Sequence, residues 1–227
     1  MSQVFLALAA FLLLHSVPAI PTIRGKLTAA LGLRFYLLVY SATSVALLIW
    51  VLQAAGSTEY IEIWQPDRWS ALANLVLSPV GLFLVTAGLI SPNPASVSFR
   101  SGAAPGAVTA ITRHPVLWGF VLWSFGHVLA NGDTRSLLVF GGLGLFSTVC
   151  IFVAEKRARR RMGAAWPSIA ELTSMFPLIA LASGRSKLRL DAHLVAALAG
   201  TLLLTLWLLM GGHAALFGAD PILALDI

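Results

Sequence analysis

The sequence has little charge. Only 11% of its 227 residues are Asp, Glu, Lys or Arg, whereas 58% are hydrophobic and the mean hydropathy is +0.87. Soluble globular chains average about 25% charged residues. This shortage excludes an ordinary soluble protein, a disordered chain and a coiled coil.

Cysteine and acidic residues are scarce as well. Cys150 is the one cysteine, which excludes a disulfide within the chain and a cluster of thiolate metal ligands. There are 9 acidic residues against 15 Lys and Arg, so the net charge is +6 and the pI is near 10.3. In so apolar a chain, this excess indicates membrane topology rather than nucleic-acid binding.

Long apolar runs, by contrast, are abundant. A bilayer core about 30 Å thick needs roughly 20 apolar residues of helix. Six runs meet this need, at about residues 2–20, 31–55, 69–90 (with Pro79 as an expected kink), 115–130, 136–154 and 193–217. Residues 172–182 are too few to cross, and we expect a re-entrant or interfacial segment there. The sequence predicts an all-α polytopic bundle of about six transmembrane helices, forming a single membrane domain over residues 1–227.

The basic residues predict an orientation, because short cytoplasmic loops collect Lys and Arg. With six spans, one side holds thirteen of them: Arg24, Lys26, Arg34, Arg100, Arg113, Lys156, Arg157, Arg159, Arg160, Arg161, Arg185, Lys187 and Arg189. The other side holds Arg68 and Arg135. We therefore expect an integral protein of a bacterial inner membrane with both termini in the periplasm. The run 156–161 is expected to contact anionic lipids.

Two histidines lie within apolar spans, where an ionisable group needs a partner or a function. They are His15 and His127, on different predicted helices. Each is either a core histidine that donates to a carbonyl one turn away or a metal ligand, and the pair favours axial ligation of haem iron. Their expected depths differ by roughly 10 to 15 Å at 1.5 Å per residue, so pairing requires a tilted or broken first helix. His114 is a competing ligand.

A third feature is the stretch 111–119, Ile-Thr-Arg-His-Pro-Val-Leu-Trp-Gly. Pro115 is expected to begin a helix, which leaves Arg113 and His114 at its N-terminus, an arrangement suited to an anion such as a propionate. Snorkelling of Arg113 to lipid headgroups is the alternative. Gly119 and Gly126 would let a flat macrocycle approach. Glu155 either pairs with Arg113 or balances the basic run that follows it.

Several of these motifs together resemble the NnrU family of bacterial membrane proteins. They are Leu-His-Ser-Val-Pro at 14–18, Ser-Pro-Asn-Pro-Ala-Ser-Val at 91–97, Thr-Arg-His-Pro-Val-Leu-Trp-Gly at 112–119 and His-Val-Leu-Ala-Asn-Gly-Asp at 127–133. The resemblance covers about residues 1–180 and leaves the helix at 193–217 as an addition. It implies a role in nitrogen-oxide (denitrification) metabolism.

The chain is also similar, more distantly, to the plant zeta-carotene isomerases. That similarity implies haem b and a redox-dependent cis-to-trans isomerisation, with His15 and His127 as metal ligands. His127 lies thirteen residues beyond His114, the spacing of that group.

A competing resemblance is to the isoprenylcysteine-type membrane methyltransferases. It implies S-adenosylmethionine held by Arg113, His114 and Glu155, but Lys156 and Trp166 replace an expected acid and tyrosine. From all three we expect a cofactor site at Arg113, His114, Trp118, Gly119 and Glu155, and a haem-dependent isomerase-like or redox enzyme on a lipophilic substrate. A methyltransferase, or a non-enzymatic assembly factor for nitrite or nitric oxide reductase, is the alternative. No nucleic-acid partner is expected.

Overall fold

The computed structural model describes residues 1–18, 20–100, 102 and 104–225. The chain forms two compact units: unit 1 comprises residues 1–64 and 132–142, and unit 2 comprises residues 65–131 and 143–227. Each unit is described by itself. The single membrane domain expected from the sequence stays a prediction, and Ala19, within the first expected span, lies outside the described residues.

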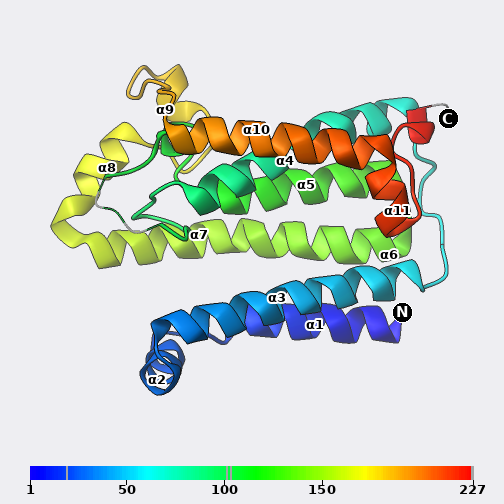
Figure 1. The fold of residues 1–227 in the computed structure, drawn as a ribbon, viewed down its shortest axis with the longest axis horizontal. Coiled ribbons are helices and arrows are strands. Elements are labelled where there is room, and N and C mark those ends of the chain that lie inside the picture. The colour runs from blue at the N-terminus through cyan, green and yellow to red at the C-terminus, as the bar shows by residue number, and fades with distance from the viewer. Residues whose placement is uncertain (19, 101, 103, 226–227) are drawn as a thin grey trace. The chain divides into compact units, whose positions relative to one another are not determined.

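Unit 1 is built on two packed helices. Helix α1 (Ser2–Ser16) lies along α3 (Leu33–Gly56), as Figure 1 shows, and buries Val4, Ala7, Leu8 and Phe11. Helix α2 (Pro21–Leu31) lies between α1 and α3 in the sequence. It is bent by 84° from α1 and buries no residue. The sequence did not predict α2, although Pro21 stands at a position that favours helix initiation.

The rest of unit 1 returns to the far end of α3. Gly132 has a left-handed backbone (φ +65°), as expected for a tight turn, and Asp133 accepts a hydrogen bond from the Ser136 amide. Asp133 is thus the N-cap of the helix that follows. That helix is α6 (Thr134–Ser136), which continues through the π-helical residues Leu137–Gly141. Arg135 donates to the Ala55 and Thr58 carbonyls near the end of α3.

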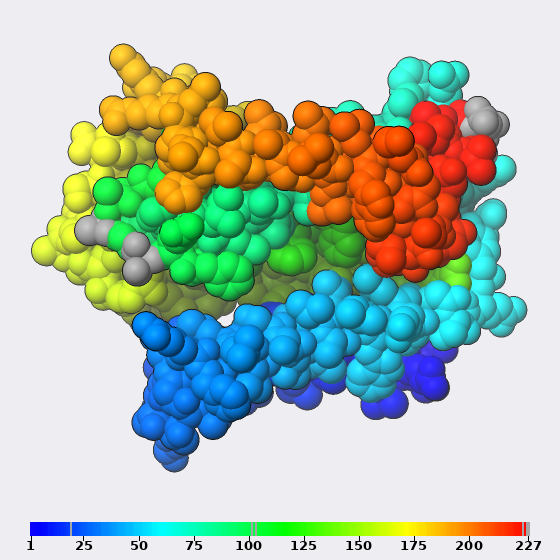
Figure 2. All heavy atoms as spheres, viewed as in Figure 1, coloured from blue at the N-terminus to red at the C-terminus, as the bar shows by residue number. Residues whose placement is uncertain are grey.

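Unit 2 is a bundle of long helices. Its central pair is α4 (Arg68–Ile90) and α5 (Pro115–Asn131), against which α10 (Ala192–Trp207) packs (Figure 1). In Figure 2, α10 forms an exposed ridge along this unit, with α11 (His213–Phe217) after it. Helix α7 (Gly142–Met162) leads to α8 (Trp166–Leu172) and to the short α9 (Ile179–Ala182). Helix α4 is continuous through Pro79.

The all-α membrane architecture is confirmed, although the expected number of spans is not. Among the described residues, four helical segments are long and apolar enough to cross a membrane: Leu33–Gly56, Arg68–Ile90, Thr134–Leu172 and Ala192–Phe217. The bent pair α1 and α2 adds a fifth if it is one span. Helix α5 has 17 residues because it begins at Pro115 and ends at the Gly132 turn, so it falls below the length of the others. In the described part of the chain, β-pairing is limited to an isolated bridge between Glu62 and Asp133.

Residues 173–178, within the expected re-entrant segment 172–182, form a non-helical strap between α8 and α9. Its last residue, Leu178, has a left-handed backbone with φ +66°. Thr173 and Ser174 are buried. The strap crosses the end of unit 2 where α5 begins, since the Leu178 amide donates to the Ile111 carbonyl at 2.7 Å.

Basic residues gather at this same end of unit 2. At this end the last turn of α7 is joined to the loop after α4, because Arg161 Nη2 donates to the Pro94 carbonyl at 2.5 Å. Ten of the eleven Lys and Arg of unit 2 lie there, and Arg68 at the start of α4 is the exception. The charge separation expected from the sequence is therefore present within this unit taken alone.

Candidate functional site

Five polar side chains meet at the start of α5, and we call them the polar cluster: Ser96, Arg113, His114, Glu155 and Thr173. Pro115 begins α5 as predicted, because a proline ring suits the first helical position. The two preceding residues, Arg113 and His114, therefore point from the helix end toward α7 and the strap, which supply Glu155 and Thr173.

Arg113 is 4% exposed and its charge is neutralised inside the protein. Its Nη1 pairs with Glu155 Oε1, its Nε donates to Thr173 Oγ1 at 2.9 Å, and its Nη2 donates to the Thr173 carbonyl at 3.1 Å. The guanidinium also lies over the Trp166 ring, 4.6 Å from its centre. The predicted pairing of Glu155 with Arg113 is confirmed. Snorkelling of Arg113 is excluded, because its side chain is buried.

His114 is fully buried between a hydroxyl and a carboxylate. Its Nε2 lies 2.8 Å from Glu155 Oε2, and its Nδ1 lies 2.9 Å from Ser96 Oγ. A carboxylate only accepts, so Nε2 carries a proton toward Glu155, and Nδ1 shares a hydrogen bond with the serine hydroxyl. Both ring nitrogens of His114 are engaged within the polar cluster, so a metal would have to displace Glu155 or Ser96 from it.

The strap is fastened to this cluster mainly through its backbone. The Arg113 amide donates to the Ser174 carbonyl at 2.7 Å, and Thr112 Oγ1 donates to the Met175 carbonyl at 2.9 Å. Trp118, predicted to contact a cofactor, donates its Nε1–H to that same Met175 carbonyl at 2.8 Å. Asn93 adds a bond to the Arg113 carbonyl at 3.0 Å. These bonds make the polar cluster the fastening point of the strap.

Asp191, the N-cap of α10, holds the segment that leads into Arg113. Its Oδ1 accepts from the Leu194 amide at 2.7 Å, and its Oδ2 accepts from the Ala107 amide at 2.8 Å. Partial burial raises the pKa of this carboxyl, but the amide donors Ala107 and Leu194 outweigh it and leave the pKa below its ordinary value. Ionised Asp191 therefore stabilises this corner of unit 2.

In the polar cluster the charges of Arg113 and Glu155 pair with each other, so the cluster is a buried ion pair rather than an open anion site. Burying charge is costly unless every group is paired, and here each charge has a partner. A propionate, or the cofactor of a methyltransferase, would have to compete with Glu155 for Arg113. The geometry thus gives the expected roles of Arg113, His114 and Glu155 in holding a cofactor no direct support.

His15 lies in unit 1, near the end of α1. Its Nδ1 is 2.8 Å from the Phe11 carbonyl, one turn earlier, and its Nε2 is 3.1 Å from Ser44 Oγ on α3. Its ring stacks on Phe11 with centroids 4.1 Å apart and meets the edge of Tyr40.

His127 lies in unit 2, on α5. Its Nδ1 is 2.8 Å from the Trp123 carbonyl and 3.3 Å from Ser78 Oγ on α4. Ser78 in turn donates to Asn74 Oδ1 at 2.5 Å, so a short polar row runs along α4 beside the histidine.

The two histidines share a tautomer that fits metal ligation. A carbonyl only accepts hydrogen bonds, so Nδ1 is protonated in both rings, and in the neutral ring the lone pair is on Nε2. This bond to a carbonyl one turn back is also what a core histidine makes. Among the described residues no group of three or more His, Cys, Asp or Glu is placed to hold a metal ion. The pairing of His15 with His127 stays a prediction, since the histidines lie in different units.

Gly119 and Gly126 have another role than the one expected. A Cβ on Gly119 would lie 2.5 Å from the Gly81 carbonyl oxygen, and one on Gly126 would lie 2.5 Å from Asn74 Oδ1. The space beside both glycines is filled by α4. The glycines therefore allow α4 to pack closely on α5, and this space is not open to a macrocycle.

Sequence reasoning assigned no functional role to Ser44, Ser78, Ser96 or Thr173. Ser96 and Thr173 lie in loops, and the sequence carries no periodic signal that would place them beside α5. A polar residue within an apolar helix, such as Ser44 or Ser78, is a usable signal, because membrane bundles bury hydroxyls against other polar groups.

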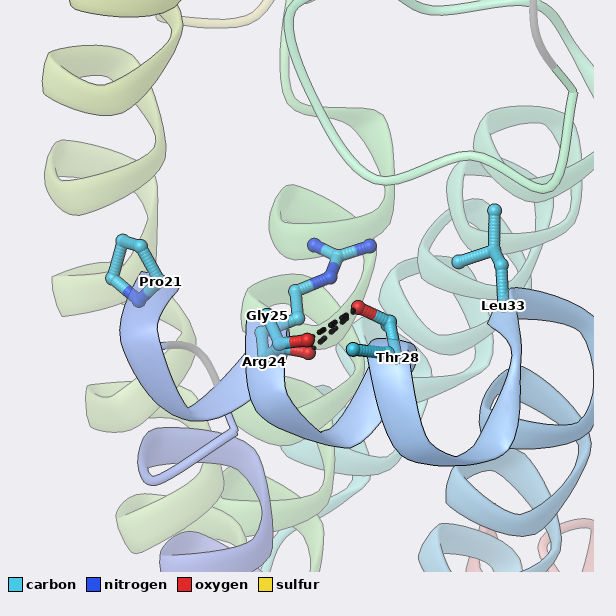
Figure 3. A pocket seen from close by; sticks show the side chains of 6 residues that line it. Pro21, Arg24, Gly25, Thr28 and Leu33 are labelled. Carbon is cyan, nitrogen blue, oxygen red and sulfur yellow. Dashed lines mark hydrogen bonds between the residues drawn. The ribbon is translucent and has the colours of Figure 1, made fainter.

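A hollow lies elsewhere, on α2. It is open and shallow, and it is lined by Pro21, Arg24, Gly25, Thr28, Ala29 and Leu33, five of which are labelled in Figure 3. The Thr28 hydroxyl bonds to the carbonyls of Arg24 and Gly25, as the dashed lines show. The hollow contains none of the predicted site residues.

Comparison with known proteins supplies a family. Two 15-cis-zeta-carotene isomerases of chloroplasts, from Zea mays and Arabidopsis thaliana, are each 31% identical over 86 residues, or 38% of this chain. The match spans only 24% and 23% of those two relatives. No solved structure matches the chain significantly. The NnrU protein family model matches residues 3–221, nearly the whole sequence, including the C-terminal helix. The chain belongs to the NnrU family.

Proposed function

We propose that this NnrU protein is a haem-binding membrane enzyme with a redox or isomerase-like activity on a lipophilic substrate. The observation that carries the proposal is the shared geometry of His15 and His127. Each is embedded in an apolar helix, and each donates Nδ1–H to a carbonyl, so that in the neutral ring Nε2 carries the lone pair a metal would bind.

The distant similarity to plant enzymes named 15-cis-zeta-carotene isomerases supports the choice of substrate class. Helices with apolar exposed faces are consistent with a substrate that arrives from the lipid phase, as a polyene or quinone would. When bound, haem would supply an iron centre that exchanges single electrons and binds nitrogen ligands. The proposal also includes a role in nitrogen-oxide metabolism. It places the protein in a bacterial inner membrane, with the basic end of the bundle in the cytoplasm and both termini in the periplasm.

The protein's own residues would act as holders and orienters. His15 and His127 would hold the iron, with the Phe11 and Trp123 carbonyls fixing the orientation of the rings. The polar cluster would keep the strap closed over the start of α5 and so exclude water there. Within the described part of the chain, no contact favours methyl transfer or a non-enzymatic assembly role over this proposal.

The test is an absorption spectrum of the purified full chain after expression with ample haem. We expect a Soret band that is lost or shifted in His15→Ala and in His127→Ala and is retained in the control His193→Ala. His193 is a suitable control because it lies in the first turn of α10, a different helix from those that carry His15 and His127. Absence of a Soret band, or full haem retention in the His15→Ala plus His127→Ala double variant, would refute the proposal.

A further inference from the structure

The exposed face of α7 changes from apolar to cationic within one turn. Leu145, Val149 and Phe152 follow one another at helical spacing on this face and are 68%, 52% and 54% exposed. The same stripe continues four residues later with Lys156 and then reaches Arg160. In a membrane helix, such a change marks the boundary between hydrocarbon and headgroups.

Four cations surround this boundary, and we call them the α7 cation surface: Lys156, Arg157, Arg159 and Arg160. All four are exposed. The ion pairs found among the described residues are Arg113 with Glu155, His114 with Glu155 and Arg135 with Asp133, so none of them neutralises this surface. Its charge must therefore be balanced from outside the protein.

The backbone under this surface is held in place. Ala158, on the opposite face of the same turn, is fully buried and packs with Ala95 and Trp166. Arg161, just beyond the surface, donates to the Pro94 carbonyl at 2.5 Å. Both contacts are within unit 2, so the four cations are presented from a fixed turn of helix.

We propose that the α7 cation surface binds the phosphates of anionic phospholipids. Lipid is the occupant because the exposed apolar residues one turn earlier place the cations at headgroup depth, where a phosphate is attached to acyl chains. A soluble nucleic acid would meet hydrocarbon-facing side chains at the same place. This inference is independent of haem.

The experiment measures lipid retention by the purified full chain in a neutral detergent, using native mass spectrometry. The probes are phosphatidylglycerol and phosphatidylcholine, with inorganic phosphate and glycerophosphoglycerol as competitors without acyl chains. The variant is Lys156→Gln plus Arg157→Gln plus Arg160→Gln. The control is Lys187→Gln plus Arg189→Gln, which removes exposed cations from the loop before α10.

We expect the wild type and the control to prefer phosphatidylglycerol. The triple variant should lose roughly fivefold in affinity per removed cation, about 100-fold in all, and the preference should weaken in high salt. Since all three residues are exposed, the variant should fold, which its unchanged thermal midpoint in lipid-free detergent would verify. An unchanged preference in the triple variant would overturn the proposal. Full displacement of lipid by inorganic phosphate would also overturn it and assign the surface to a free anion.

Discussion

The buried pair of Arg113 and Glu155 gives the sharpest prediction about stability. In Glu155→Gln the side-chain shape is kept, but Arg113 loses its counter-charge while it remains 4% exposed. Leaving a buried charge unpaired costs about 3 to 5 kcal/mol. Arg113 keeps its bonds to Thr173 and its position over Trp166, and the Glu155 side chain is 24% exposed, so water can reach this edge. We therefore expect a loss of about 3 kcal/mol, the lower end of that range.

The assay is unfolding in mixed micelles, combined with hydrogen exchange of the strap amides. The strap should exchange roughly 100-fold faster in Glu155→Gln, because a difference of 1.4 kcal/mol is a factor of ten. Glu171→Gln, an exposed acid on α8, is the matched control and should change stability by less than 0.5 kcal/mol. The double variant Arg113→Met plus Glu155→Leu should recover most of the loss, since it removes both charges. Equal stability of Glu155→Gln and Glu171→Gln would refute this reasoning.

Three further predictions concern other parts of the molecule. Ser44→Ala removes the hydroxyl that iron must displace from His15 Nε2, so haemin titration should show about threefold tighter binding. Gly119→Ala forces a Cβ to within 2.5 Å of the Gly81 carbonyl and should lower stability by about 1 to 3 kcal/mol in mixed-micelle unfolding, whereas Gly200→Ala, with open space around it, should not. Because the pKa of Asp191 is lowered in the folded protein, its carboxylate stabilises the fold above pH 3.8, and this stabilisation is lost as the pH falls through the folded pKa. Thermal midpoints of wild type and Asp191→Asn should accordingly differ at pH 6, and the difference should shrink as the pH falls below 3.8.

The helices themselves were predictable because long apolar runs leave few alternatives in a bilayer. The number and bounds of the spans were harder to predict, because they depend on single residues. Pro115 and the Gly132 turn shorten α5, and the helix at 21–31 is too polar to be recognised as part of a span. The N-cap at Asp133 was predictable because Asp commonly caps helices.

The candidate site was predictable only in part. Arg113, His114 and Glu155 were singled out because polar groups beside apolar spans need partners, and the structure brings them together. Their further partners Ser96 and Thr173 were not, since these lie in loops 17 and 60 residues from Arg113, and no periodicity relates such segments. Gly119 was misassigned because a glycine that admits another helix and one that admits a ligand have the same sequence signature.

The central claim, that His15 and His127 bind one haem, is tested most directly by electron paramagnetic resonance of the ferric haem-loaded protein. Two imidazole ligands should give a low-spin spectrum in the wild type. Removal of either histidine alone should convert it to high spin, and added imidazole should restore low spin. A high-spin wild type, or a low-spin signal that survives in both His15→Ala and His127→Ala, would contradict the account.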